Sequence, residues 1–439
     1  TLMVNKGLPL GGTCVNVGCV PSKTLLWVGE IMHQAKYHGI PGLDIKVKNF
    51  DFAAAVRHEL DLVNNLRAEK YEKVLSGLEG VTHLDGKATF ISPHEIEVDG
   101  QTYSAQKFII ATGSTATVPN VEGINEVGFV THVEALQLKQ LPRELLVMGA
   151  GPVGLEFAQM YARFGTKVTL LHHSDSIFSR AEAQLTWRLV EILTQEGITI
   201  QTNAQVKAVR REGEKKVVQY TVNEKTQEVF VDEILLAVGK TANTQGLGLD
   251  KAGVEIDERQ AVKVNTQLQT SQAHVFAVGD VTNAPKRLET TAGREGTLAA
   301  EKALKGTDQS IDYNSVPWTI FTDPQLAGVG VTEDEQMKQM GVCACRSISF
   351  EYVPKAIIMN RTEGLIKMAI HPETKEIMGV HILAPNAGEL IAEAMALIKN
   401  KNTIGDVVNS LPMFPTLSEA IKLVAMSFTK DIKKLSCCI

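Results

Sequence analysis

Two cysteines stand near the N-terminus in the run Gly11-Gly12-Thr13-Cys14-Val15-Asn16-Val17-Gly18-Cys19-Val20-Pro21-Ser22-Lys23. A helical pattern extends from about Pro21 to Ala35, and proline suits the first turn of a helix. The pattern therefore predicts that Cys14 lies in a loop and that Cys19 lies at the start of the helix.

The start of a helix is a favourable place for a thiolate. Free backbone N–H groups and the positive end of the helix dipole should lower the pKa of Cys19 from the free value of about 8.5. A structural disulfide is one alternative, but such bridges belong mainly to small secreted domains. Half of a zinc site is another, but the further ligands it needs at short spacing are absent. Redox use of the pair is favoured.

The whole run resembles the redox-active disulfide of the pyridine nucleotide–disulfide oxidoreductases. This flavoenzyme family includes lipoamide dehydrogenase, glutathione reductase, thioredoxin reductase of high molecular weight and mercuric reductase. The resemblance covers nearly the whole chain and implies that Cys14 and Cys19 form the disulfide. Cys19 would then be the thiolate against the flavin, Cys14 the outer exchanging thiol, and Lys23 a neighbour of flavin N5. Three residues before Cys14 would also line the FAD site: Gly11, Gly12 and Thr13.

Length and composition fit such an enzyme. The chain has 439 residues, enough for about three domains with cores of their own. A net charge of −6 without a basic run argues against nucleic acid or an anionic membrane as a partner. No apolar stretch is long enough to span a bilayer, and no signal peptide is recognisable. Six cysteines in this length predict reduced thiols and a cytoplasmic protein.

The first residues predict the end of a strand, Thr1 to Val4, followed by a turn at residues 5–7. In the resembled family this strand closes a βαβ unit whose glycine-rich turn holds the FAD pyrophosphate. That unit is absent from the sequence. Either the sequence is a fragment, or a βαβ segment of roughly thirty residues has been lost from its start. The second explanation is favoured, because a flavoprotein without its pyrophosphate loop would bind FAD poorly.

The segment after the cysteine run predicts a long amphipathic helix at 51–78, short strands at 81–98 and an apolar strand that begins at Phe108. This last strand ends in Ala111-Thr112-Gly113. In the resembled family such a turn passes close to the adenosine of the flavin, so Thr112 and Gly113 are expected to contact FAD.

A glycine motif typical of phosphate binding, G-x-G-x-x-G, stands at residues 149–154. The motif stands in the order strand, turn, helix and strand that it requires: Glu144–Met148, Gly149–Gly154, Leu155–Phe164 and Lys167–Leu171. Gly149, Gly151 and Gly154 are therefore predicted to bind a dinucleotide. The second strand ends in His172-His173-Ser174 with Arg180 beyond, where an NAD site usually offers a carboxylate. Because His172 and Arg180 could meet a 2′-phosphate, NADPH is preferred over NADH.

The helix after the glycines carries Glu156 and Tyr161. In the resembled family the equivalent glutamate pairs with the lysine that matches Lys23, and the pair flanks flavin N5. The alternative is a carboxylate on the surface of the helix. Tyr161 is expected to be a core aromatic, with a place beside a metal as the alternative.

A later stretch returns the chain to FAD. A buried strand at 233–238 ends in Gly239, which is expected to lie near the cofactors. The run from Thr270 to Asp280 resembles the second FAD motif of the family, in which the carboxylate of Asp280 accepts hydrogen bonds from the ribityl hydroxyls and Gly279 forms the turn. The FAD domain is therefore discontinuous.

The predicted fold is α/β, with two Rossmann-like dinucleotide-binding domains, for FAD and NAD(P), and an α+β interface domain. The predicted boundaries are 1–141 for the first part of the FAD domain, 142–268 for the NAD(P)H domain, 269–314 for the return to FAD and 315–439 for dimerisation. The resemblance implies a two-fold homodimer in which the C-terminal end completes the active site of the partner. Cys343 and Cys345 should share one face of a strand, as packing thiols.

Two departures distinguish this chain within the family. Disulfide-reducing members carry a histidine near the end, which moves a proton to or from the substrate thiol. Phe414 stands in its place, and a phenyl ring cannot transfer a proton. The chain then ends in Ser436-Cys437-Cys438-Ile439, and soft thiolates prefer soft metals. Both features resemble the mercuric reductase branch.

This resemblance implies reduction of Hg(II), presented as small-molecule thiol complexes, by NADPH through FAD. Cys437 and Cys438 would collect the metal and pass it to Cys14 and Cys19. The alternatives are a dithiol/disulfide oxidoreductase of the lipoamide dehydrogenase or thioredoxin reductase kind, and a thiol protein that binds mercury without turnover. Tyr161 and Thr416 could line the path of the metal, but spacing alone does not decide this.

Overall fold

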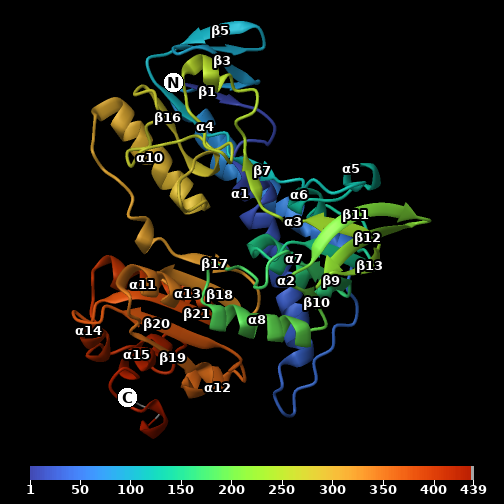
Figure 1. The fold of residues 1–439 in the computed structure, drawn as a ribbon, viewed down its shortest axis with the longest axis vertical. Helices are drawn as coiled ribbons and strands as arrows, with labels where there is room; N and C mark the ends of the chain where they lie inside the picture. The colour runs from blue at the N-terminus through green and yellow to red at the C-terminus, as the bar shows by residue number, and fades with distance from the viewer. Residues whose placement is uncertain (437–439) are drawn as a thin grey trace.

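The N-terminal helices carry the cysteine run. The computed structural model describes residues 1–436, and Figure 1 shows how they are arranged. The first elements are β1 (Leu2–Asn5), α1 (Gly12–Val17) and α2 (Cys19–Tyr37). Gly18 separates the two helices, and a Cβ atom there would lie 2.8 Å from the carbonyl oxygen of Thr13. Glycine is therefore needed for the two helices to meet so closely.

Cys19 is the first residue of α2, so its predicted place at a helix start is confirmed. The prediction of a loop for Cys14 is wrong, because Cys14 lies within α1. Gly11 and Gly12 have φ values of +96° and +62°, and they turn the chain where this short helix begins. Both cysteines therefore project from helices, on either side of Gly18.

The helix predicted at 51–78 is divided in three: α3 (Phe52–Arg67), a π-helical turn (Ala68–Glu72) and α4 (Lys73–Ser76). Asp51 caps α3 by accepting a hydrogen bond from the backbone N–H of Ala54 at 2.9 Å. The regular helix stops where its apolar face stops, because the two segments after Arg67 contain no buried residue.

The strands of the FAD region are short, as the sequence predicts. They are β2 (Thr82–Asp85), β3 (Ala88–Ser92), β4 (Glu95–Val98), β5 (Gln101–Ser104), β6 (Phe108–Ile110) and β7 (Ser114–Ala116). Strand β1 pairs in parallel with β2, while β3, β4 and β5 form an antiparallel sheet. Two small helices follow, α5 (Ile124–Val127) and α6 (His132–Ala135).

The chain returns to this region after a long excursion. Strand β16 (Val275–Ala277) pairs in parallel with β6, and β15 (Lys240–Ala242) pairs with β7. Helices α9 (Leu249–Ala252) and α10 (Glu289–Lys305) lie on either side of β16 in the sequence. The two halves of the predicted FAD domain are thus joined by a strand pair, while its boundaries at 141, 268 and 314 stay predictions.

The predicted nucleotide-binding unit is a parallel sheet in the order β10-β9-β8-β14. Its elements are β8 (Glu144–Met148), α7 (Pro152–Phe164), β9 (Lys167–Leu171), α8 (Ala183–Gln195), β10 (Thr199–Gln201) and β14 (Glu233–Leu236). An antiparallel sheet lies beside it, of β11 (Gln205–Glu212), β12 (Lys215–Val222) and β13 (Lys225–Val231). Both strands next to the glycine motif have the predicted bounds.

The C-terminal unit is an antiparallel sheet in the order β17-β18-β21-β20-β19. Figure 1 shows it with its helices at the orange-to-red end of the chain. The strands are β17 (Trp318–Ile320), β18 (Gln325–Gly330), β19 (Cys345–Ser349), β20 (Leu365–Ile370) and β21 (Ile377–Ala384). The helices are α11 (Glu333–Met340), α12 (Pro354–Ile358), α13 (Ala387–Lys399), α14 (Ile404–Val408) and α15 (Glu419–Met426).

Cys343 and Cys345 differ from their prediction as packing thiols. Only Cys345 lies in β19, and the structure joins the two residues in a disulfide. Because Cys343 precedes the strand, the alternation of side chains does not apply to it, and its sulfur turns toward that of Cys345.

The C-terminal cysteines, Cys437 and Cys438, lie outside the described residues. Among the helices within residues 1–436, none has the length and apolar character needed to cross a bilayer.

Candidate active site

The centre of the site is the pair Cys14 and Cys19, which the structure describes as free thiols. Cys19 is exposed and Cys14 is half-buried. A hydrogen bond from the Cys14 thiol, helped by the positive charge of Lys23, lowers the pKa of Cys19 to about 6. The same hydrogen bond and burial raise the pKa of Cys14. The predicted direction for Cys19 is confirmed, but its leading cause is the neighbouring thiol.

Lys23 is fixed by a long-range ion pair. Its Nζ lies 2.8 Å from Oε2 of Glu156, whose side chain is only 5% exposed. The backbone N–H of Phe321 donates to the other oxygen, Oε1, at 2.9 Å. The ring of Phe321 also lies under Lys23, with Nζ 4.6 Å from the ring centre. Glu156 is therefore a buried partner of Lys23, and its role beside a flavin stays a prediction.

A second polar layer holds helix α7 against the segment after β17. Gln159 and Asp323 exchange two hydrogen bonds, of 2.7 and 2.8 Å, between the Gln159 amide and the Asp323 backbone. The Asp323 carboxylate pairs with Arg163 at 3.1 Å and with Arg361 at 2.5 Å. Both arginines lower the pKa of Asp323 against the effect of its burial. This network anchors the backbone at Asp323, two residues after Phe321, whose N–H donates to Glu156.

Tyr161 lies on the same helix and is 1% exposed. Its hydroxyl donates to the carbonyl oxygen of Ala135 at 2.5 Å. Its place in the core agrees with the first of the two predictions for this residue.

The three glycines of the dinucleotide motif have two kinds of surroundings. A Cβ atom on Gly149 would lie 2.4 Å from the carbonyl oxygen of Ala237, and one on Gly154 would lie 1.9 Å from that of Gly149. These two glycines permit close packing of strand, turn and helix. Gly151, by contrast, caps α7 and has nothing within 4 Å of its Cβ position. The open space lies at the helix N-terminus, where a pyrophosphate is favoured.

His172 supports this turn, because its Nδ1 accepts a hydrogen bond from the backbone N–H of Ala150 at 3.2 Å. Burial lowers the pKa of His172, so the ring is neutral at pH 7. Of the two residues predicted to meet a 2′-phosphate, Arg180, which is exposed, is then left to supply the positive charge. The preference for NADPH remains a prediction that rests mainly on Arg180.

The predicted FAD residues meet where the two halves of their region join. Ser114 donates from Oγ to Oδ2 of Asp280 at 2.7 Å, which orients the carboxylate. The N–H of Gly279 donates to Oε2 of Glu295 at 2.6 Å, and Glu295 is fully buried. The hydroxyl of Tyr313 donates to the other oxygen of Glu295 at 2.8 Å. The Gly279–Asp280 turn is thus held from both sides.

The predicted turn at Thr112 and Gly113 is pinned to the segment after Gly239. Thr112 and Asn243 exchange hydrogen bonds of 2.7 and 2.8 Å between side chain and backbone. Gly113 and Gly239 both have positive φ values, +68° and +117°, and no atom lies within 4 Å of their Cβ positions. Gly12 is open in the same way. The space beside these three glycines and the oriented carboxylate of Asp280 are both features that fit the binding of a flavin nucleotide.

Several supporting residues escaped the sequence analysis. Ser114 and Phe321 contact the predicted residues Asp280 and Glu156 across 166 and 165 residues, and Glu295 contacts Gly279 from 16 residues further along the chain. No spacing rule links them to their partners: Ser114 begins β7, Phe321 follows β17 and Glu295 lies within α10, and none of these positions carries a sequence signal for its contact.

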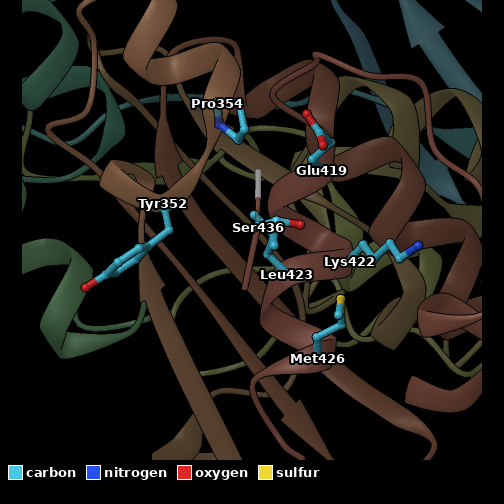
Figure 2. A pocket seen from close by; sticks show the side chains of 7 residues that line it. All are labelled: Tyr352, Pro354, Glu419, Lys422, Leu423, Met426 and Ser436. Atoms are coloured by element: carbon cyan, nitrogen blue, oxygen red, sulfur yellow. The ribbon is translucent and has the colours of Figure 1, made fainter. Parts of the chain in front are cut away.

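Phe414 and Thr416 lie in the C-terminal segment. Phe414 lies between α14 and α15 and is 45% exposed. Thr416 is held locally, since its N–H donates to Glu419 at 3.1 Å and its hydroxyl to Met413 at 2.9 Å. Figure 2 shows the last described residue, Ser436, in a small pocket beside α15. The pocket is lined by Tyr352, Pro354, Glu419, Lys422, Leu423, Met426 and Ser436.

Comparison with known proteins assigns the family. Residues 1–296 match the model "pyridine nucleotide-disulphide oxidoreductase", and residues 316–425 match the dimerisation domain of the same family. The chain therefore belongs to the pyridine nucleotide–disulfide oxidoreductases. Membership implies FAD and a nicotinamide nucleotide as cofactors, and it agrees with the two dinucleotide-binding domains and the interface domain seen in the fold.

Individual relatives fall in more than one branch. The chain is 39% identical to a mercuric reductase of Streptomyces lividans, over all of this chain and 93% of the relative. It is 36% identical to a mercuric reductase of Bacillus cereus, over 99% of this chain and 69% of the relative. A dihydrolipoyl dehydrogenase of Thermus scotoductus is also 36% identical, over 96% of this chain and 91% of the relative.

Among solved structures, the HOCl-induced flavoprotein disulfide reductase RclA of Escherichia coli is similar. The two folds superpose with a TM-score of 0.86 at 26% identity, over 98% of this chain and 94% of the other.

The lowered pKa of Cys19 predicts how the reduced protein reacts with iodoacetamide. A lowered pKa keeps the thiolate present above about pH 6 and removes it only below that value. We expect alkylation at Cys19 to rise with a midpoint near pH 6, while Cys14 reacts only in alkali. In Lys23→Met the midpoint should move upward. Peptide mapping at each pH locates the alkylated cysteine. A midpoint near pH 8.5 for Cys19 in the unaltered chain would contradict the lowered pKa of this thiol.

The different surroundings of Gly151 and Gly154 predict separable defects. Gly154→Ala places a methyl group against the Gly149 carbonyl and should destabilise the fold by about 1–3 kcal/mol. Gly151→Ala meets no protein atom and should leave stability unchanged while it weakens nucleotide binding by about tenfold or more. Denaturant unfolding and NADPH titration measure the two effects. Tight NADPH binding by Gly151→Ala would show that the phosphates do not approach this turn.

Proposed function

We propose that this chain is a mercuric reductase that uses NADPH and FAD to reduce Hg(II) to Hg(0). The observation that carries the proposal is Phe414, which replaces the proton-transferring histidine of the disulfide-reducing branch while Cys14, Cys19, Lys23 and Glu156 are retained. A metal ion leaves as an atom and needs no proton, so this replacement suits a metal substrate. The similarity to mercuric reductases of Streptomyces lividans and Bacillus cereus supports the same assignment.

The cofactors have defined places in this proposal. Gly151 and Arg180 would hold NADPH, and Asp280, Thr112 and Gly113 would hold FAD. When bound, FAD carries electron pairs from the nicotinamide toward the cysteine pair. Lys23 presents a positive charge beside Cys19, and Glu156 with Phe321 keeps that charge in place.

The metal would move by exchange of thiolate ligands. Cys437 and Cys438 of the partner subunit would displace two small thiols from Hg(SR)2, and Cys14 and Cys19 would then displace Cys437 and Cys438. Each mercury–sulfur bond that forms replaces one that breaks, so free Hg(II) is never released. Overall, Hg(SR)2, NADPH and one proton give Hg(0), NADP⁺ and two thiols.

The thiolate at Cys19 is suited to this exchange. With its pKa lowered to about 6, Cys19 offers a ligand for mercury at neutral pH without prior loss of a proton. Cys14 keeps its proton until the metal binds, because its own pKa is raised. The proton released from Cys14 would leave with the displaced thiol.

A homodimer and a cytoplasmic location complete the proposal. The match of residues 316–425 to a dimerisation domain supports the dimer. Exposed apolar side chains on the interface domain are consistent with a covered face, notably Leu411 and Met413 at 94% and 76% exposed.

The competing function is reduction of a dithiol or disulfide substrate. The 36% identity to a dihydrolipoyl dehydrogenase favours this alternative, and Phe414 speaks against it. A protein that binds mercury without turnover is disfavoured because it would not need the ion pair of Lys23 with Glu156.

The proposal is tested by NADPH oxidation with the FAD-loaded protein. Hg(II) is offered with excess small thiol in one assay, and oxidised lipoamide is offered in another. We expect oxidation that depends on mercury, release of volatile mercury, and no turnover of lipoamide. Turnover of lipoamide alone would assign the chain to the disulfide reductases, and retention of mercury without NADPH oxidation would indicate a binding protein.

The C-terminal cysteines generate a further prediction. Cys437→Ala/Cys438→Ala should lose most mercury-dependent turnover, on the order of tenfold, when competing thiol is abundant, because metal must then be captured by exchange. Ser436→Ala serves as the matched control at the neighbouring position and should behave as the unaltered chain. Full turnover by the double variant under competing thiol would remove the tail from the relay.

A further inference from the structure

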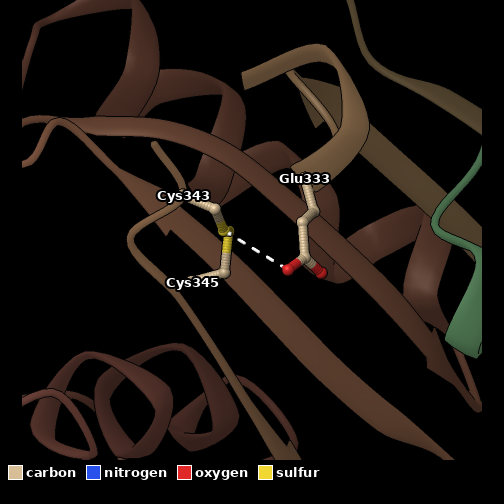
Figure 3. A group of neighbouring side chains, drawn as sticks. All are labelled: Glu333, Cys343 and Cys345. Atoms are coloured by element: carbon tan, nitrogen blue, oxygen red, sulfur yellow. Dashed lines mark hydrogen bonds between the residues drawn. A yellow bond between two sulfur atoms is a disulfide. The ribbon is translucent and has the colours of Figure 1, made fainter. Parts of the chain in front are cut away.

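A second group of soft and hard donor atoms lies far from residues 14–23 in the sequence. Cys343 and Cys345 stand where the chain enters β19, opposite the first turn of α11. Sγ of Cys343 lies 3.4 Å from Oε1 of Glu333 (Figure 3). Donor atoms of Glu333, Cys343 and Cys345 all lie within 4.8 Å of one another. All three residues are half-buried, so the group can be reached from solvent.

Glu333 is held in position by buried charges. Its Oε2 contacts the Nζ of Lys367, which is 7% exposed and also donates to Glu182 at 2.8 Å. Glu182 accepts the backbone N–H of Glu333 on its other oxygen at 2.7 Å. This arrangement turns the remaining oxygen, Oε1, toward the sulfurs. The carboxylate is thus oriented before any ligand arrives.

The cysteine loop is also anchored. Gln336 is fully buried, and its Oε1 accepts the backbone N–H of Ala344 at 3.2 Å. The same oxygen lies 3.5 Å from Sγ of Cys345. Gln336 donates in turn to the carbonyl oxygen of Ile370 at 2.8 Å. Helix α11 and strand β20 therefore hold both cysteines on one side of a fixed loop.

We propose that Cys343 and Cys345, in their reduced form, bind one soft divalent cation with Glu333 as the third ligand. Two thiolates separated by one residue form a chelate, and thiolates select soft cations. Two thiolates and the carboxylates of Glu333 and Glu182 carry negative charge, whereas Lys367 carries one opposing positive charge. A divalent cation therefore reduces the repulsion among the negative groups. This site needs neither FAD nor NADPH and stands apart from the proposed function.

The chemistry balances in two steps. Two small thiols reduce the Cys343–Cys345 disulfide, giving two protein thiols and one small-molecule disulfide. The protein thiols then displace two thiolates from a cation M(SR)2. Two metal–sulfur bonds form and two break, and the two protons of the protein pass to the released thiols. In the disulfide neither sulfur is a thiolate, so the pair can bind the cation only after reduction.

The test uses the full chain with serine at Cys14, Cys19, Cys437 and Cys438, so that only Cys343 and Cys345 remain of the six cysteines. After reduction and removal of the reductant, Cd(II) is added and the ultraviolet absorption of cadmium–thiolate bonds is followed. We expect one Cd(II) per chain. No cadmium–thiolate absorption, or thiols that cannot be reduced, would overturn the proposal.

The role of Glu333 is tested by a matched pair. Glu333→Gln should weaken Cd(II) binding about tenfold, because it removes a charged ligand and keeps the size of the side chain. Asp334→Asn removes the same charge at the next position of α11, which is exposed, and should leave the affinity unchanged. Equal affinities for the two variants would exclude Glu333 as a ligand.

A second measurement avoids any dependence on the folding of the fourfold serine variant. In the unaltered reduced protein, Cd(II) should protect the peptide that carries Cys343 and Cys345 from iodoacetamide, as read by mass spectrometry. Alkylation of that peptide at the same rate with and without Cd(II) would also overturn the proposal. Neither result depends on whether Hg(II) is turned over, so the two proposals can fail separately.

Discussion

The ion pair between Lys23 and Glu156 connects parts of the chain that no local rule brings together. It spans 133 residues and joins helix α2, which presents Cys19, to helix α7, which follows the glycine turn. Glu156 is buried, so its charge is tolerated only because Lys23 and the Phe321 N–H both satisfy it. The carboxylate of Glu156 thus links the helix of the cysteine pair, the helix after the nucleotide turn and the start of the interface domain.

The sequence predicted best where the signal is local. The strands at 144–148 and 167–171 and the helix start at Cys19 follow from apolar runs, glycine spacing and a proline, which act over a few residues. The direction of the Cys19 pKa shift was predictable for the same reason. Its main cause was missed, since the sequence does not show that the Cys14 thiol points at Cys19.

Contacts between distant segments account for what the sequence did not reveal. Ser114 beside Asp280 and Phe321 beside Glu156 are set by how sheets and helices pack, and either residue alone looks ordinary. The disulfide at Cys343 and Cys345 was not predicted because strand alternation was extended to Cys343, which lies two residues before β19 begins. The ion pairs of Lys367 with Glu182 and Glu333 likewise join residues up to 185 positions apart.

The pairing of β6 with β16 has a consequence for how the chain acquires its fold. Strand β6 is made early, but its parallel partner emerges only after the whole nucleotide-binding unit has been synthesised. Closing so long a loop is entropically costly unless the inserted unit has already folded and brought the ends together. The inserted unit would therefore fold first, and the turn that orients Asp280 would form late, when both halves can meet.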